Sequence, residues 1–120
     1  MAVISDLHVI GPWTKLDALA RVIERINGMD VDVVFVLGDF IAPRVMPGTR
    51  AAAADIMEVV ARLTAPLGVY ATLGNHDWSD DDKATRNDYT RSGVEDALTA
   101  ANLTALVNDA AELRKDDGSF

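Results

Sequence analysis

The sequence predicts an α/β fold in which short buried strands alternate with amphipathic helices. Three apolar segments are typical of strands, at residues 2–5, 33–37 and 69–73, and a helical pattern separates each from the next. Strands that alternate with helices form βαβ units, so we expect a mostly parallel sheet with right-handed crossovers. Ligands of such sheets bind at the carboxyl ends of the strands, and functional residues are expected there.

The first half of the chain contains two expected strands and one expected helix. The strand at residues 2–5 is followed by apolar residues that recur with helical spacing: Leu16, Leu19, Val22, Ile23 and Ile26. Asn27 and Gly28 then provide a helix stop signal. The unbroken apolar run at residues 33–37 is typical of a central strand that is covered on both faces.

The second half repeats this alternation. A loop at residues 40–48 contains two prolines and precedes a helix that we expect to begin near Thr49. The apolar positions of this helix are Ile56, Val59, Val60 and Leu63. After the strand at residues 69–73 we expect a polar loop at residues 77–91, then a helix that opens with the capping-box pattern Ser92 to Glu95, and a fourth strand at residues 104–109.

Composition narrows the functional classes. A length of 120 residues corresponds to one domain or part of one, and 49% hydrophobic residues can form a core. The absence of cysteine excludes disulfides and thiolate metal sites. A net charge of −8 disfavours nucleic acid as a partner. There is no signal sequence and no apolar run near the roughly 20 residues that span a bilayer, so we expect a cytoplasmic or membrane-associated location.

Side chains that can bind metals follow all three expected strands. They are Asp6 and His8 after the first strand, Asp39 after the second, and Asn75, His76 and Asp77 after the third. Parallel topology brings the three strand ends to one edge of the sheet, so these residues should converge. Asp6 and His8 are two residues apart and would point to the same side of an extended backbone. Oxygen and nitrogen donors without sulfur suit Mn, Fe, Zn, Co or Ni.

Each motif alone is a weak signal. Most D-x-H sequences are coincidental, most GD pairs after a strand are turns, and GNHD could be an Asx-type turn. The three motifs together, each at an expected strand end, favour a functional site. Among other polar residues, we expect the acidic run at residues 80–82 to be a solvated loop and Arg44 to be a surface arginine, although Arg44 could reach a phosphate.

The order of D-x-H, GD and GNHD resembles the calcineurin-like metallophosphoesterase superfamily, whose members hydrolyse phosphate esters at a two-metal site. The segments ISDLHV, VLGDF and APLGVYATLGNHD are similar to one bacterial branch of that superfamily. The resemblance is specific from Ile4 to Asp77 and only general beyond. It implies that residues 1–120 form the N-terminal portion of the domain, a βαβαβ half of an αββα sandwich with helices on one face of the sheet.

The resemblance also implies a role for each site residue. Asp6 and His8 would bind the first metal, Asp39 would bridge two metals, and Asn75 would bind the second. His76 would face the phosphate and protonate the leaving group, and Asp77 would orient His76. A hydroxide activated by the two divalent ions would attack the phosphorus in line.

The chain departs from the family pattern in its ligand count. The pattern continues with a further histidine and a GHxH motif, whereas this chain has only two histidines. We therefore expect a longer protein whose C-terminal half carries the missing ligands, and little activity in this chain alone. The full-length enzyme would use two divalent ions, manganese among the candidates, to hydrolyse a small-molecule or lipid-linked phosphodiester or phosphomonoester. The alternative is a non-catalytic metal-binding or scaffold domain of the same fold.

Overall fold

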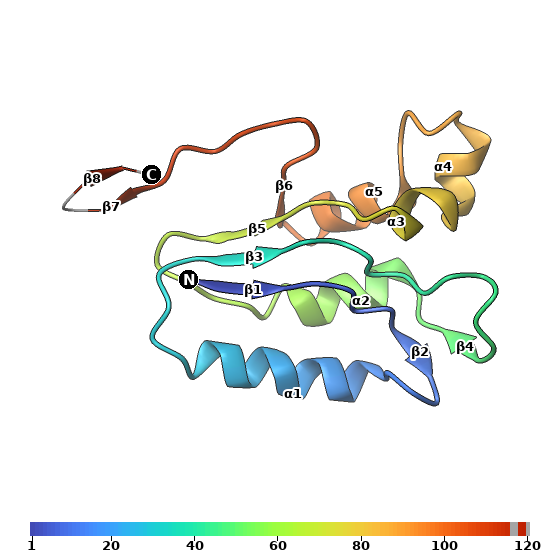
Figure 1. The fold of residues 1–120 in the computed structure, drawn as a ribbon, viewed down its shortest axis with the longest axis horizontal. Coiled ribbons are helices and arrows are strands. Elements are labelled where there is room, and N and C mark those ends of the chain that lie inside the picture. Colours follow the sequence, from blue (N-terminus) through green and yellow to red (C-terminus); the bar gives the residue numbers. More distant parts are fainter. Residues whose placement is uncertain (116–117, 120) are drawn as a thin grey trace.

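A four-stranded parallel sheet organises the chain in a computed structural model that describes residues 1–115 and 118–119. The strands lie in the order β1 (Ala2–Ile4), β3 (Val34–Val36), β5 (Val69–Ala71) and β6 (Thr104–Ala105) (Figure 1). Every neighbouring pair in this sheet is parallel. The expected α/β fold with a mostly parallel sheet is confirmed.

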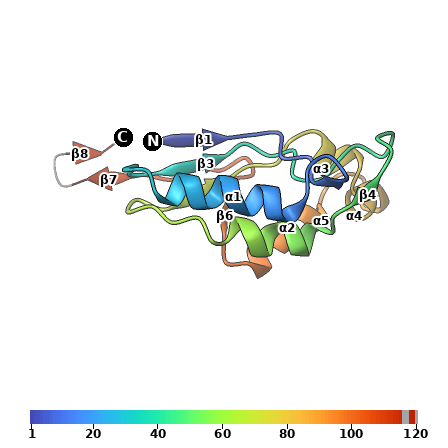
Figure 2. The ribbon, with the colours of Figure 1, turned by 90° about the horizontal axis from the view of Figure 1, so that it is seen from below.

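Three helices cover one face of this sheet. They are α1 (Leu16–Asn27), α2 (Ala53–Val60) and α5 (Gly93–Ala100), and Figure 2 shows all three on the same side. Their apolar residues Ile23, Ile56 and Leu98 pack in one core with Val34 and Val36 of the central strand, and all five are fully buried. Alternate residues of a strand point to opposite faces, so the even-numbered residues of β3 face these helices.

The opposite face of the sheet is not covered by any element of the described residues (Figure 2). Val3, Phe35 and Tyr70 lie side by side across three strands on this face. Val3 keeps 49% of its surface exposed, and Leu37 keeps 47%. The apolar run at residues 33–37 had predicted a strand covered on both faces, whereas here only one face is covered.

Several short elements differ from the sequence expectation. Thr49 does not begin a helix but lies in β4 (Thr49–Arg50), which pairs antiparallel with β2 (Ile10–Gly11), and α2 begins four residues later. The segment expected to be a polar loop, residues 77–91, includes most of α3 (His76–Ser79) and all of α4 (Asp82–Arg86). After the sheet, β7 (Arg114–Lys115) pairs antiparallel with β8 (Gly118–Ser119).

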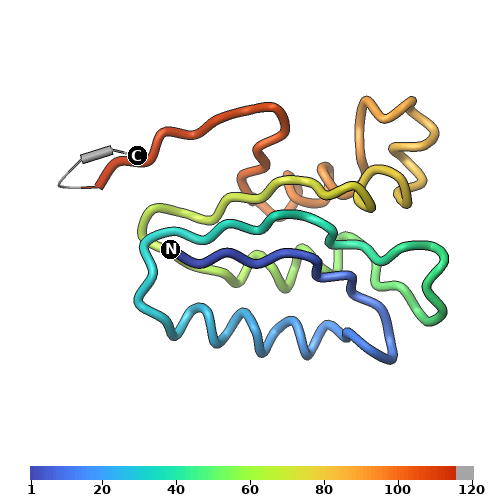
Figure 3. The backbone as a smooth tube through the Cα atoms, in the orientation of Figure 1, coloured from blue at the N-terminus to red at the C-terminus, as the bar shows by residue number. Residues whose placement is uncertain are grey.

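The loops that follow β1, β3 and β5 leave the sheet at the same end. Figure 3 shows β1, β3 and β5 running in one direction, so the loops after them gather at one edge. Topology therefore supplies the convergence that the sequence predicted. Among the described residues no helix is long and apolar enough to cross a membrane.

Candidate metal centre

Backbone hydrogen bonds extend the pairing of β1 and β3 into the loops that follow them. Asp6 N–H donates to the Gly38 carbonyl at 3.2 Å, and His8 N–H donates to the Asp39 carbonyl at 2.9 Å. The two loops therefore run beside each other past the ends of their strands. This pairing places the D-x-H motif directly beside the aspartate of the GD motif.

Glycine allows the loop after β3 to touch the loop after β5. A Cβ atom added to Gly38 would lie 2.1 Å from the backbone nitrogen of Gly74, and one added to Gly74 would lie 2.1 Å from Oδ1 of Asp39. Gly38 also has a φ of +83°, as its expected turn requires. The Asp39 carboxylate accepts the His76 backbone N–H at 3.0 Å across this contact. The loops after β3 and β5 therefore approach so closely that a residue with a Cβ atom would clash at either position.

Three candidate ligands have backbone conformations that side chains other than glycine rarely adopt. Asp6 has a φ of +56°, His8 of +37° and Asp39 of +53°. Such conformations cost about 1–3 kcal/mol each and cluster at functional sites, where the surrounding structure imposes them. They also correct the expected geometry of the D-x-H motif, because its backbone is not extended. The two side chains nevertheless approach each other.

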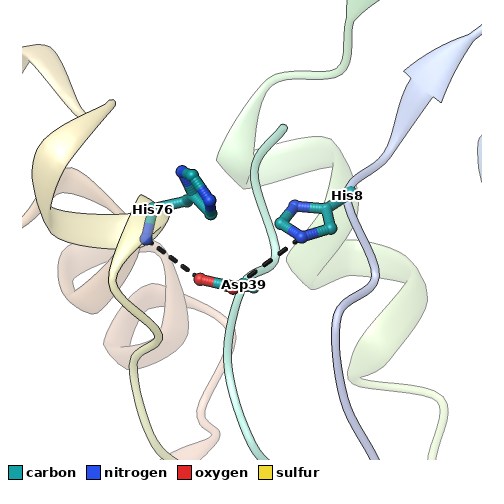
Figure 4. A group of neighbouring side chains, drawn as sticks. All are labelled: His8, Asp39 and His76. Atoms are coloured by element: carbon teal, nitrogen blue, oxygen red, sulfur yellow. Dashed lines mark hydrogen bonds and ion pairs between the residues drawn. The ribbon is translucent and has the colours of Figure 1, made fainter. Parts of the chain in front are cut away.

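The side chains of His8, Asp39 and His76 form a cluster suited to a metal ion. One ligand atom from each can be chosen so that all three lie within 4.8 Å of one another (Figure 4). His8 Nε2 lies 3.8 Å from a carboxylate oxygen of Asp6 and 3.7 Å from one of Asp39. Two donors that each lie about 2.1 Å from one ion can be at most about 4.2 Å apart, so these separations fit a shared ion.

A hydrogen bond at Nδ1 determines the tautomer of each histidine. His8 Nδ1 lies 3.0 Å from the Ile41 carbonyl, and His76 Nδ1 lies 2.7 Å from Oδ2 of Asp80. A carbonyl or an ionised carboxylate only accepts, so each Nδ1 carries the proton and donates it. Nε2 of each ring is then the atom left for a metal or a substrate. Histidine ligands of metals are commonly oriented in this way.

Three hydrogen-bond donors converge on the carboxylate of Asp80. Besides His76, the Arg44 backbone N–H donates to Oδ1 at 2.8 Å and the Ser79 hydroxyl donates to Oδ2 at 2.9 Å. Desolvation of the carboxyl raises its pKa, but the hydrogen bonds from Arg44, His76 and Ser79 outweigh that effect and lower the pKa to about 2. Asp80 is therefore ionised at neutral pH.

The carboxylate of Asp77 binds backbone N–H groups and not the His76 ring that it was expected to orient. This buried carboxylate accepts the backbone N–H groups of Phe40, Ile41 and Gly74 at 2.9, 3.1 and 2.9 Å. Burial raises the pKa of this carboxyl despite these bonds. No hydrogen bond found in residues 1–115 or 118–119 joins Asp77 to the His76 ring. Asp77 fastens the loop after β3 to the turn after β5, and the orienting contact expected of it is made by Asp80.

The remaining expected residues lie around this cluster. Asn75 is exposed at the start of α3, and its side chain makes no capping hydrogen bond. The acidic run at residues 80–82 is not simply solvated: Asp81 caps α4 through the Ala84 N–H at 2.7 Å, and Asp82 pairs with Arg44. Asp80 was not among the site residues predicted from the sequence. The available signal was the i, i+4 spacing of His76 and Asp80, which brings two side chains together on a helical turn.

Comparison with known proteins gives the family. The family model for the calcineurin-like phosphoesterase matches residues 1–113. The chain belongs to the calcineurin-like phosphoesterase family. A Caenorhabditis elegans protein described as a metallophosphoesterase is 33% identical over 78 residues, which cover 65% of this chain and 15% of that protein. A Danio rerio transmembrane protein with a metallophosphoesterase domain is 32% identical over 78 residues, 65% of this chain and 16% of that protein.

The match spans about a sixth of the length of those two curated relatives. No solved structure matches the chain significantly. The nitrogen and oxygen donors of His8, Asp39 and His76 suit divalent transition metals.

Proposed function

We propose that the protein containing this chain is an enzyme that hydrolyses phosphate esters with two divalent ions. The observation that carries this proposal is the convergence of His8, Asp39 and His76 at the carboxyl ends of three parallel strands. The positive φ angles of His8 and Asp39 support it, because a fold does not strain ligand-type residues at one place without a compensating contact.

In this proposal Asp6 and His8 would hold the first ion, Asp39 would be a ligand shared by both ions, and Asn75 would contribute to the second. The separations of His8 Nε2 from Asp6 and Asp39 support the first ion, and the central position of Asp39 supports its bridging role. Divalent ions bound there would draw charge from the phosphoryl oxygens and activate water at neutral pH. The identity of the ions is open among Mn, Fe, Zn, Co and Ni.

His76 would act on the leaving group. Its Nδ1 proton is held by Asp80, so Nε2 is the ring atom that can face a bound phosphate. In its protonated form His76 would donate the Nε2 proton to the departing alkoxide. General acid catalysis of this kind typically contributes 10²- to 10⁴-fold to the rate, or roughly 3–5 kcal/mol.

We also propose that residues outside this chain complete the site and the domain. The family pattern requires further histidine ligands, and the two histidines of this chain, His8 and His76, are already assigned as a metal ligand and the general acid. A C-terminal half that supplies these ligands would also cover the sheet face of Val3 and Phe35. The same proposal includes membership of the bacterial branch of the family and a cytoplasmic or membrane-associated location. It also includes a small-molecule or lipid-linked phosphoester as the substrate. Nucleic acid is disfavoured as a partner by the charge of −8.

The alternative function is a metal-binding or scaffold domain without turnover. The shortage of ligands favours it, since only two histidines are present. The polar contacts of His76 argue against it. A scaffold needs no imidazole whose Nδ1 is held by a carboxylate and whose Nε2 is left free.

A pair of histidine variants in the full-length protein separates these functions. With Mn²⁺ and an aryl phosphodiester or monoester as substrate, His76→Ala should lower kcat by about 10²- to 10⁴-fold and leave metal content unchanged. His8→Ala should instead lower metal content, measured by elemental analysis after dialysis. Wild-type turnover in His76→Ala would show that His76 has no role in catalysis. A metal-loaded wild-type protein that hydrolyses neither substrate would support the scaffold alternative.

A further inference from the structure

We infer that Asp80 is the positioning residue of His76: it holds the imidazole by Nδ1 and so directs Nε2 toward the metal cluster. The catalytic consequence of this role rests on the function proposed above, but the role itself rests on contacts within the chain. His76 opens the single turn of α3 and Asp80 follows it directly, four residues on. Their side chains meet at 2.7 Å, and the Asp80 side chain is only 16% exposed.

The carboxylate of Asp80 is itself fixed from a second direction. The Arg44 backbone N–H donates to its other oxygen, and the Arg44 Nε–H donates to the Asp80 carbonyl at 3.3 Å. Arg44 belongs to the loop that begins at Asp39. Asp80 therefore connects the loop that carries the central carboxylate of the cluster to the turn that carries His76. A movement of either loop would be transmitted to the ring.

Neither of the other nearby acceptors can take this role. The Asp77 carboxylate is buried and is occupied by three backbone N–H groups. The Ile41 carbonyl accepts from His8, whose ring lies edge-to-face against that of His76 with centroids 5.3 Å apart. Each of the two rings thus donates its Nδ1 proton to a different acceptor. Asp80 is the acceptor assigned to His76.

Removing the carboxylate should change which ring nitrogen of His76 carries the proton. Free histidine favours the tautomer protonated at Nε2, whereas the bond to Asp80 requires the proton at Nδ1. Without Asp80 the ring would also lose the carboxylate that stabilises its protonated form, which is the form that would donate from Nε2. The contact that fixes the orientation of the ring would be lost with it. Loss of such outer partners typically costs about 10- to 100-fold in activity or affinity.

The test combines a spectroscopic readout with kinetics in the full-length protein. ¹⁵N-histidine labelling and long-range ¹H–¹⁵N spectra of the metal-free protein at pH 8 should show His76 protonated at Nδ1. Asp80→Asn should shift His76 toward the Nε2 tautomer and lower kcat for an aryl phosphodiester about 10- to 100-fold, with KM and Mn²⁺ affinity changed far less. Asp82→Asn is the matched control, because Asp82 contacts Arg44 but not His76. It should leave both readouts as in the wild type.

Three results would overturn the inference. They are a wild-type His76 protonated at Nε2, an Asp80→Asn variant with an unchanged tautomer and kcat, or an Asp82→Asn variant that changes both as strongly. If Asp80→Asn does not fold, the wild-type spectrum still decides, because an ionised acceptor at 2.7 Å demands the Nδ1 proton. The tautomer is read without metal or substrate. An inactive wild type would therefore defeat the proposed function while leaving this inference to its own test.

Discussion

Replacing Gly74 by alanine should disrupt the metal site through steric contact alone. The added Cβ would lie 2.1 Å from Oδ1 of Asp39 and 2.5 Å from its backbone nitrogen. Ordinary van der Waals contact begins near 3.4 Å, so Asp39 or the turn must move by about 1.3 Å. The φ of Gly74 lies outside the left-handed region, so the substitution adds no backbone strain of that kind.

The expected cost has two parts. Overpacking of this kind costs about 1–3 kcal/mol. Displacing Asp39 would also weaken its bond to the His76 N–H, a charged hydrogen bond worth about 1.5–3 kcal/mol. With partial relaxation we expect a loss of about 2–4 kcal/mol in the free energy of unfolding, which corresponds to roughly 6–15 °C in Tm for a chain of this size. A displacement near 1 Å at a catalytic ligand can lower activity about 10²-fold.

Thermal melting and isothermal titration with Mn²⁺ measure the two effects separately. Gly28→Ala is the matched control, because Gly28 has a φ of −81° and its added Cβ would meet nothing closer than 3.5 Å. That variant should melt within a few degrees of the wild type and bind metal equally well. If Gly74→Ala melted like Gly28→Ala and kept its metal affinity, the close approach of the two loops would not be required for the site.

Three further outcomes are expected. Asp77→Asn should lower the free energy of unfolding by about 2–4 kcal/mol in urea titrations, because its amide cannot accept all three backbone N–H groups; an unchanged midpoint would contradict this role. Asp80 has its pKa lowered to about 2 from an ordinary 3.8, so its stabilisation is complete above pH 4 and is lost as the pH falls toward 2. The stability gap between wild type and Asp80→Asn should therefore narrow over that window, and a gap independent of pH would refute the assignment. The isolated chain should self-associate through its uncovered sheet face in sedimentation velocity at micromolar concentration, and Leu37→Lys should reduce this; a monomeric wild-type chain would contradict it.

The sequence by itself determined the order and type of the main elements and the edge of the sheet at which the site lies. Strand alternation and helical periodicity are local properties, and Val34, Val36, Ile23 and Ile56 lie in the core as their spacing predicted. Parallel topology brings His8, Asp39 and His76 to one edge of the sheet. For this reason three motifs far apart in the sequence could be placed together without a structure.

Only the tertiary structure decided which side chain supports which. GNHD places Asp77 next to His76 in sequence, yet the backbone of the loop after β3 surrounds Asp77 with N–H groups and leaves the ring to Asp80. Likewise, the positive φ angles of Asp6 and His8 arise because their loop pairs with the loop after β3. The i, i+4 spacing of His76 and Asp80 allows their contact, but local sequence cannot specify that Asp77 is occupied elsewhere or that the two loops pair, since both depend on a backbone segment more than thirty residues away.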